Sequence, residues 1–186
     1  MKYGTKYGAD YVNKLFAGVQ KNLKISHLFT CFTDDSEGLD KQIQVKPLRN
    51  QWQGWWSKVH IFDQEAYSSP RWVFYIDLDM IITSSLDELV SMHIRTDGMV
   101  DRSFTLATLS TNDIFCENVA NGYNSSVVLF RTDRCHILYE TLARYYKHLL
   151  RFLMRFDHYL EMLVWNAVIV QEKLPGQVVD YSSHFL

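Results

Sequence analysis

The sequence predicts an α/β fold in which helices flank an open, mixed and mostly parallel sheet. Two observations support this prediction. Short apolar runs alternate along the chain with segments whose apolar residues recur at helical spacing. In addition, residues 72–76 form an apolar run without polar alternation, which is typical of a strand buried on both faces inside a parallel sheet.

The first half of the chain alternates helical and extended patterns. Apolar residues fall four apart from Tyr11 to Val19, which predicts a helix, and a polar loop separates two short apolar runs that predict strands. A tryptophan-rich segment after Pro47 places its apolar residues on one helical face, and its tryptophans are expected in the core. The predicted elements are a helix over 9–21, strands over 24–32 and 43–45, a helical segment over 52–62 and a strand in the run 72–82, which includes Asp77 and Asp79.

The second half continues this alternation. Ser85 and Glu88 have the spacing of a capping box, so a short helix is expected to begin at Leu86. The remaining predicted elements are strands over 104–110 and 125–131, helices over 133–153 and 158–171, and a last strand over 177–181. Because no internal repeat, low-complexity tract or linker interrupts them, residues 1–186 are predicted to form a single domain.

Composition excludes several classes of protein. With 186 residues, of which 47% are hydrophobic and 22% charged, the chain has the composition of an ordinary globular domain. A net charge of −2 argues against a nucleic-acid-binding protein, which would carry a basic excess. Cys31, Cys116 and Cys135 are odd in number and widely spaced, which predicts reduced, buried thiols and a cytoplasmic location. No apolar stretch approaches the roughly 20 residues of a spanning helix.

Asp77 and Asp79 follow the apolar run 72–76 and are the most informative residues of the chain. Side chains two apart on a strand point the same way, so both carboxylates are expected on one face at the strand end. Two adjacent carboxylates are costly unless a cation or ligand compensates their charge, and Mg²⁺ or Mn²⁺ bridged to phosphate oxygens is the usual compensation. The alternative is that Asp77 starts a turn and Asp79 is solvated.

Six sequence blocks occur in a fixed order around these aspartates. They are YGTKYGADYV at 3–12, CFTDD at 31–35, GWWSK at 54–58, DLD at 77–79, GYNSS at 122–126 and LPGQVV at 174–179. Together they resemble the small DxD-type nucleotide-sugar glycosyltransferases of the GT-A fold, which are related to glycogenin and to bacterial lipopolysaccharide galactosyltransferases. The resemblance covers nearly the whole chain. It implies a Rossmann-like sheet and the transfer of a sugar from a UDP-sugar donor to a glycan acceptor.

The resemblance also implies ligands for a metal ion and for the nucleotide. Asp77 and Asp79 match the motif that binds Mn²⁺ or Mg²⁺ across the donor diphosphate, and His184 is the candidate for a third metal ligand. The alternative for His184 is a tail histidine without a partner. The nucleotide would be bound by residues of the first block and of the DxD motif, namely Gly4, Thr5, Tyr11, Asp77, Leu78 and Asp79.

Further positions match the donor-sugar site of these enzymes. Lys58 stands where relatives keep a basic residue near the phosphate or sugar, although a lysine on an apolar helix face can also merely extend its ammonium to solvent. Asn124 and Ser125 could bond sugar hydroxyls, or Asn124 could be a turn residue that satisfies its own backbone. Asp157 resembles an acidic residue that grips the donor, but the neighbouring Gly and Gln of that block are absent. The catalytic candidates are therefore Asp77, Asp79, Lys58 and Asp157.

The resemblance leaves some features open. UDP-glucose and UDP-galactose are the first candidates for the donor, and no residue decides between retention and inversion. The strand that should precede Tyr3 is nearly absent, so either the strand is short or the chain is trimmed from a longer one.

A basic helical face over residues 144–155 indicates a possible peripheral contact with an anionic membrane, and its alternative is a solvated face. This face consists of Arg144, Lys147, His148, Arg151 and Arg155.

Two other functions compete with glycosyl transfer. A phosphohydrolase of the haloacid dehalogenase type also carries Asp-x-Asp at a strand end, but it requires a threonine where Ile81 stands. A non-catalytic module that binds nucleotide sugars is the second alternative, because a fold does not establish turnover.

Overall fold

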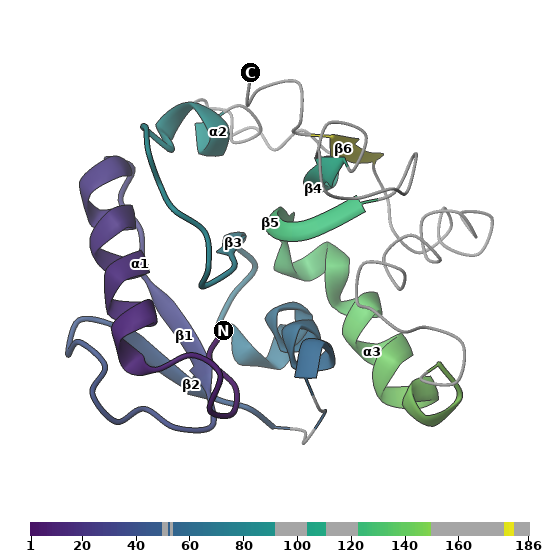
Figure 1. The fold of residues 1–186 in the computed structure, drawn as a ribbon. Coiled ribbons are helices and arrows are strands. Elements are labelled where there is room, and N and C mark those ends of the chain that lie inside the picture. Colours follow the sequence, from purple (N-terminus) through teal and green to yellow (C-terminus); the bar gives the residue numbers. More distant parts are fainter. Residues whose placement is uncertain (50–51, 53, 92–103, 111–122, 150–176, 181–186) are drawn as a thin grey trace.

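The computed structural model describes residues 1–49, 52, 54–91, 104–110, 123–149 and 177–180 (Figure 1). In this part of the chain, helices and two small sheets form a mixed α/β structure. The α/β class predicted from the sequence is therefore confirmed. The second long predicted helix, over 158–171, lies outside the described residues.

Residues 1–49 include a helix and a two-stranded parallel sheet. Helix α1 spans Ala9–Asn22 and buries Val12, Leu15, Phe16 and Val19 on one face. Strand β1 (Thr30–Thr33) pairs in parallel with β2 (Gln44–Pro47). The strand predicted over 24–32 thus forms mainly at its end, because the paired residues begin at Thr30.

The segment before the aspartates is more tightly wound than predicted. The tryptophan-rich region forms the 3₁₀ helix η1 (Gly54–Phe62), and a second short 3₁₀ turn, η2, spans Gln64–Ala66. Strand β3 (Trp72–Ile76) follows, and helix α2 (Asp87–Ser91) begins one residue after the predicted start. The Ser85 hydroxyl accepts a hydrogen bond from the Asp87 N–H at 3.2 Å and so helps to fix this start.

Strand β3 belongs to a four-stranded sheet with the order β3-β5-β4-β6. The other members are β4 (Phe104–Ser110), β5 (Tyr123–Arg131) and β6 (Gln177–Asp180). Strand β5 runs antiparallel to both β3 and β4, and β4 pairs in parallel with β6. The expectation of a mostly parallel sheet is therefore wrong for the described strands, since two of their four pairings are antiparallel. An apolar run specifies a buried strand but not its direction.

Two apolar clusters lie on opposite faces of these strands. In β1, Cys31 packs into the cluster with α1 and α2, whereas the next residue, Phe32, packs into the cluster with η1 and helix α3 (Thr132–Leu149). In β3, Phe74 and Tyr75 divide in the same way. Because successive strand residues point to opposite faces, β1 and β3 share one layer between two layers of helices.

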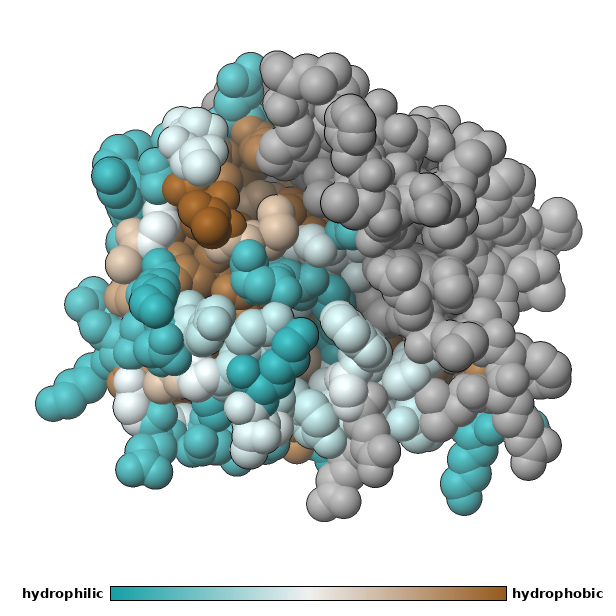
Figure 2. Space-filling model, viewed as in Figure 1, coloured by the Kyte–Doolittle hydropathy of each residue, from teal (hydrophilic) through white to brown (hydrophobic). Residues whose placement is uncertain are grey.

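Helix α3 confirms the helix predicted over 133–153 as far as Leu149. It buries Cys135, Leu138 and Leu142 against η1 and the sheet. In Figure 2 hydrophobic side chains reach the surface between α1 and α2, and hydrophilic ones cover most of the remaining described surface on that face. Among the helices that the structure describes, none has the length and apolar character needed to cross a membrane.

Candidate functional site

Asp77 and Asp79 lie in a turn that directly follows β3, so the prediction that the strand carries both aspartates is wrong. The structure places them as the alternative describes, with Asp77 at the start of a turn and Asp79 exposed to solvent. The Asp77 N–H donates to the Ser126 carbonyl at 2.8 Å, and the Met80 N–H closes the turn onto the Asp77 carbonyl at 3.3 Å. Leu78, between them, is buried in the cluster with α1. The turn therefore anchors its apolar residue in the core, while Asp77 is half-buried and Asp79 is exposed.

The carboxylate of Asp77 is held by two partners inside the protein. Lys58 Nζ donates to Asp77 Oδ2 at 2.9 Å, and the Tyr75 hydroxyl donates to Asp77 Oδ1. Burial, followed by the charge of Asp77, raises the pKa of Tyr75 well above its ordinary value, so the hydroxyl stays protonated as a donor. The protein's own groups thus compensate the charge of this aspartate.

Lys58 connects three elements at this point. It lies on η1, it pairs with Asp77 at the end of β3, and its Nζ donates to the Ser125 hydroxyl at 3.0 Å and to the Ser125 carbonyl at 3.3 Å on β5. Only 8% of Lys58 and 2% of Ser125 are exposed to solvent. The interpretation of Lys58 as a lysine that extends into solvent is therefore wrong, and the structure brings together three of the predicted site residues.

Asp79 has a separate partner near the amino terminus. The Tyr7 hydroxyl donates to Asp79 Oδ2 at 2.7 Å. Tyr7 packs edge-on against Tyr11 with ring centroids 4.9 Å apart. Lys6 Nζ lies 4.7 Å from the Tyr7 ring centroid and 5.5 Å from that of Trp55, whose side chain is 63% exposed. An exposed group of aromatic rings and one ammonium therefore borders the carboxylates.

The carboxylates of Asp77 and Asp79 affect the pKa of Lys6, the lysine in this aromatic group. A hydrogen bond with Tyr7 raises the pKa of Lys6 above its ordinary value, and the carboxylates of Asp79 and Asp77 raise it further. The pKa of Tyr75 is raised mainly by burial, and the carboxylates of Asp77 and Asp79 raise it further.

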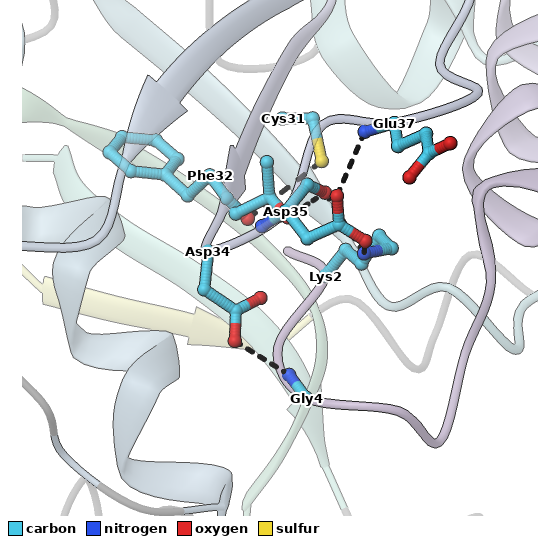
Figure 3. Close-up of polar contacts among 8 residues, drawn as sticks. Lys2, Gly4, Cys31, Phe32, Asp34, Asp35 and Glu37 are labelled. Carbon is cyan, nitrogen blue, oxygen red and sulfur yellow. Dashed lines mark hydrogen bonds and ion pairs between the residues drawn. The ribbon is translucent and has the colours of Figure 1, made fainter.

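The predicted nucleotide-binding loop is fixed to the segment after β1 (Figure 3). The Gly4 N–H donates to Asp34 Oδ2 at 3.1 Å, and Lys2 Nζ forms an ion pair with Asp35 Oδ2 at 3.0 Å. Gly4 has a φ of 62°, a left-handed conformation that favours glycine. Thr5 is exposed in the same loop. The first two sequence blocks therefore meet in space, and the first block contacts the DxD turn through the hydrogen bond of Tyr7 to Asp79.

Asn124 lies near the start of β5, on a strand and not in the turn of the alternative interpretation, and its contact with a sugar stays a prediction. Its side-chain Oδ1 accepts a hydrogen bond from the Ser126 N–H at 2.9 Å, so the amide satisfies nearby backbone. Of the three clustered tryptophans, Trp52 and Trp56 are buried in the core as predicted, whereas Trp55 is exposed.

Several predicted residues lie outside the described part of the chain. These are Asp157, His184, Arg151, Arg155 and Cys116. Within the described residues, no group of three or more His, Cys, Asp or Glu side chains is arranged to hold a metal ion. Arg144, Lys147 and His148 are exposed on α3, so membrane contact through residues 144–155 stays a prediction. Cys31 and Cys135 are buried thiols, as expected.

Sequence analysis did not predict the two tyrosines that donate hydrogen bonds to Asp77 and Asp79. Tyr75 could have been found, because it precedes Asp77 by two positions and therefore shares its side of the strand. Tyr7 gave no such signal, since it lies 72 residues from Asp79.

Comparison with models of known protein families finds no match for this chain, and a search of curated protein sequences finds no match either.

Proposed function

We propose that this protein is a metal-dependent glycosyltransferase that moves a sugar from a UDP-sugar to a glycan acceptor. The observation that carries the proposal is the convergence of Asp77 and Ser125 on Lys58 Nζ at the end of β3, beside Asp79. Buried polar groups that converge on a strand end, with an exposed carboxylate next to them, are typical of a binding site in an α/β protein.

Asp77 and Asp79 would hold the divalent ion. Carboxylate oxygens are the ligands that Mg²⁺ and Mn²⁺ prefer, so the donor chemistry fits. Both Asp77 oxygens and one Asp79 oxygen already accept hydrogen bonds from Lys58, Tyr75 and Tyr7. An ion would therefore compete with these donors, and its remaining ligands would come from phosphate oxygens or from a residue such as His184.

The charges of the site suit a diphosphate leaving group. A bound Mn²⁺ or Mg²⁺ would supply neutralisation of the negative charge that develops on the diphosphate. Lys58 keeps a second positive charge within the site, and Lys6 adds a third at its exposed border. These ammonium groups favour binding of the phosphates and stabilise the leaving diphosphate during bond cleavage.

The aromatic border supports a nucleotide or sugar ligand. The rings of Tyr7 and Tyr11 and the exposed Trp55 offer flat apolar surfaces next to the carboxylates. Such faces stack on nucleobases and cover the apolar side of sugar rings. UDP-glucose and UDP-galactose are the first donors to test.

A module that binds nucleotide sugars without turnover is the second candidate. The ion pair of Asp77 with Lys58 favours it, because the protein compensates this carboxylate without a metal. The two candidates predict the same ligand but differ in product formation.

The deciding experiment measures UDP release and UDP-sugar binding in parallel. The wild type, Asp79→Asn and Asp10→Asn are each incubated with UDP-glucose or UDP-galactose and Mn²⁺. Asp10 is the matched control, since it is exposed and pairs with Lys14 on α1. We expect Mn²⁺-dependent release that falls on the order of 100-fold in Asp79→Asn and is unchanged in Asp10→Asn.

Three other outcomes contradict the proposal in different ways. Binding without UDP release supports the non-catalytic module. Release of inorganic phosphate from simple phosphoesters supports the haloacid dehalogenase alternative. Release that is insensitive to both Mn²⁺ and Asp79→Asn places the reaction at another site.

A further inference from the structure

Tyr75 reaches the candidate site from inside the protein. It lies on β3, is 8% exposed and packs its ring into the apolar cluster with η1 and α3. The one polar atom of its side chain is the hydroxyl oxygen, and this hydroxyl donates to Asp77 Oδ1. A phenylalanine would fill nearly the same volume in the cluster, so packing alone does not account for the hydroxyl. What the hydroxyl adds is the bond to Asp77.

Lys58 holds both members of this bond. Its Nζ lies 5.3 Å from the centroid of the Tyr75 ring, so the ammonium stands over one face of that ring. The same Nζ donates to Asp77 Oδ2 at 2.9 Å. Tyr75 and Lys58 therefore each hold one oxygen of the same carboxylate.

These contacts leave the Asp77 carboxylate little freedom to rotate. The Asp77 N–H is bonded to the Ser126 carbonyl at 2.8 Å, and each carboxylate oxygen has a donor. An ionised carboxylate offers about four lone-pair sites, so two hydrogen bonds leave it able to bind a further ligand. Asp77 is thus held in one orientation and keeps the capacity to bind an ion.

We propose that Tyr75 is a positioning residue, whose hydroxyl orients the Asp77 carboxylate for a divalent ion. The inference rests on the proposed function, which makes Asp77 a ligand of that ion. Hydrogen bonds to a carboxylate that binds a metal fix its direction, and their loss typically lowers metal affinity about 10- to 100-fold.

The Tyr7 hydroxyl, which donates to Asp79, differs from that of Tyr75 in exposure. An ion competes with both hydroxyls for the carboxylate oxygens, but the bond from Tyr7 is exposed and Tyr7 can turn away. Tyr75 is buried, with Lys58 over its ring, and cannot turn away without opening the apolar cluster. Removal of the two hydroxyls should therefore have opposite effects, with stronger Mn²⁺ binding without the Tyr7 hydroxyl and weaker binding without that of Tyr75.

The test measures the Kd of Mn²⁺, used alone as the probe, by titration calorimetry in the wild type, Tyr75→Phe and Tyr67→Phe. Tyr67 is the matched control, because it is half-buried and its hydroxyl donates to the backbone carbonyl of Ile61 at 2.6 Å. We expect the Kd to rise on the order of tenfold in Tyr75→Phe and less than about twofold in Tyr67→Phe. Asp77 keeps its bond with Lys58 in Tyr75→Phe, so this variant is expected to fold, which thermal unfolding checks.

A second comparison shows whether Tyr75 acts through Asp77. In the Asp77→Asn background, the further substitution Tyr75→Phe should change the Kd of Mn²⁺ by less than about twofold, because the carboxylate that it orients is gone. A general loss of structure would instead weaken binding equally in both backgrounds.

An unchanged or lower Kd in Tyr75→Phe would overturn the proposal. An equal rise in Tyr67→Phe, or an undiminished rise in the Asp77→Asn background, would overturn it as well. UDP release from UDP-glucose is measured on the same samples to separate this inference from the proposed function. Weaker Mn²⁺ binding in Tyr75→Phe, together with no UDP release from the wild type, would support the positioning role and contradict sugar transfer. A wild type that binds no Mn²⁺ contradicts both.

Discussion

Lys58 Nζ lies 2.9 Å from Asp77 Oδ2 and joins η1 to the end of β3, although the two residues are 19 positions apart in the sequence. Their side chains are 10% and 20% exposed, so the pair is largely shielded from water. The ammonium of Lys58 therefore offsets part of the charge repulsion between the two neighbouring aspartates. Because both members of this pair are candidate site residues, a substitution of either is expected to change the stability of the protein as well as its activity.

Replacing Lys58 should destabilise the protein strongly. The substitution Lys58→Met keeps the length of the side chain but leaves Asp77 without its cation, and the loss of one partner of a buried pair costs about 3 kcal/mol. We expect Tm to fall by roughly 6–12 °C, measured by calorimetry at neutral pH.

Lys14→Met is the control for Lys58→Met, because Lys14 pairs with Asp10 on the surface with 76% of its side chain exposed. Such a pair is worth less than about 1 kcal/mol. A similar decrease in Tm in both variants would show that the Lys58–Asp77 pair stabilises the protein no more than an exposed ion pair does.

Added Mn²⁺ should raise Tm more in Lys58→Met than in the wild type, since the ion can replace the missing charge at Asp77.

Removing the Tyr7 hydroxyl should strengthen divalent-ion binding. Tyr7 donates to Asp79 Oδ2, and an ion must compete with that bond. The net worth of an exposed hydrogen bond of this kind is about 1 kcal/mol, which corresponds to roughly a fivefold lower Kd for Mn²⁺ in Tyr7→Phe. Titration calorimetry measures this change, with Tyr11→Phe as the control. A weaker affinity in Tyr7→Phe would instead mean that the hydroxyl helps to place the carboxylate for the ion.

Asp87 should contribute to the loss of stability in acid. Its carboxylate accepts hydrogen bonds from the N–H groups of Lys24 at 2.7 Å and Ile25 at 3.1 Å, and the first of these contributes most to lowering the pKa of Asp87 below its ordinary value. A group whose pKa is lowered by folding stabilises the protein above its unfolded pKa. That stabilisation is lost as the pH falls through the folded pKa.

The variant Asp87→Asn should therefore have a lower Tm at pH 7 and a smaller decrease in Tm between about pH 5 and pH 2. Thermal unfolding followed by circular dichroism across this range measures both effects. Glu88→Gln is the control, because Glu88 is the exposed neighbour of Asp87. A pH profile for Asp87→Asn that parallels the wild type would exclude this carboxylate as a source of acid sensitivity.

Cys31 and Cys135 should resist alkylation in the native state. Burial raises the pKa of both thiols, so little reactive thiolate forms near neutral pH. Iodoacetamide labelling followed by peptide mass spectrometry should modify both residues in urea and leave both largely unmodified without it. Because Cys31 also lines a cavity of about 470 Å³ bordered by β1 and β3, faster labelling of Cys31 than of Cys135 would indicate access through this cavity.

Local sequence patterns predicted most elements of the fold but not how they join. The strand over 104–110 was predicted with its bounds, because an apolar run between polar segments has few alternatives. The segment 52–62 was expected to be helical, and residues 54–62 form a 3₁₀ helix that packs against α3, with Trp56 against Tyr146. Strand direction and the division into two sheets depend on tertiary contacts, which spacing along the chain does not encode.

For the candidate site too, the sequence predicted individual residues but not the contacts between them. The motif spacing identified Asp77 and Asp79, and the resemblance pointed to Lys58 and Ser125. The bonds that connect these residues span 19 residues from Lys58 to Asp77 and 67 from Lys58 to Ser125. Such contacts exist only after β3 and β5 have paired.

The geometry of the site depends on the register in which β3 pairs with the antiparallel strand β5. Ile76 lies opposite Val127, and just beyond this last pair Asp77 and Ser125 both accept hydrogen bonds from Lys58. A slip of one residue would turn the Ser125 side chain to the opposite face of the sheet and remove it from Lys58. Substitutions at Trp72 or Arg131, at the far end of this pairing, can therefore disable the site without touching any of its residues.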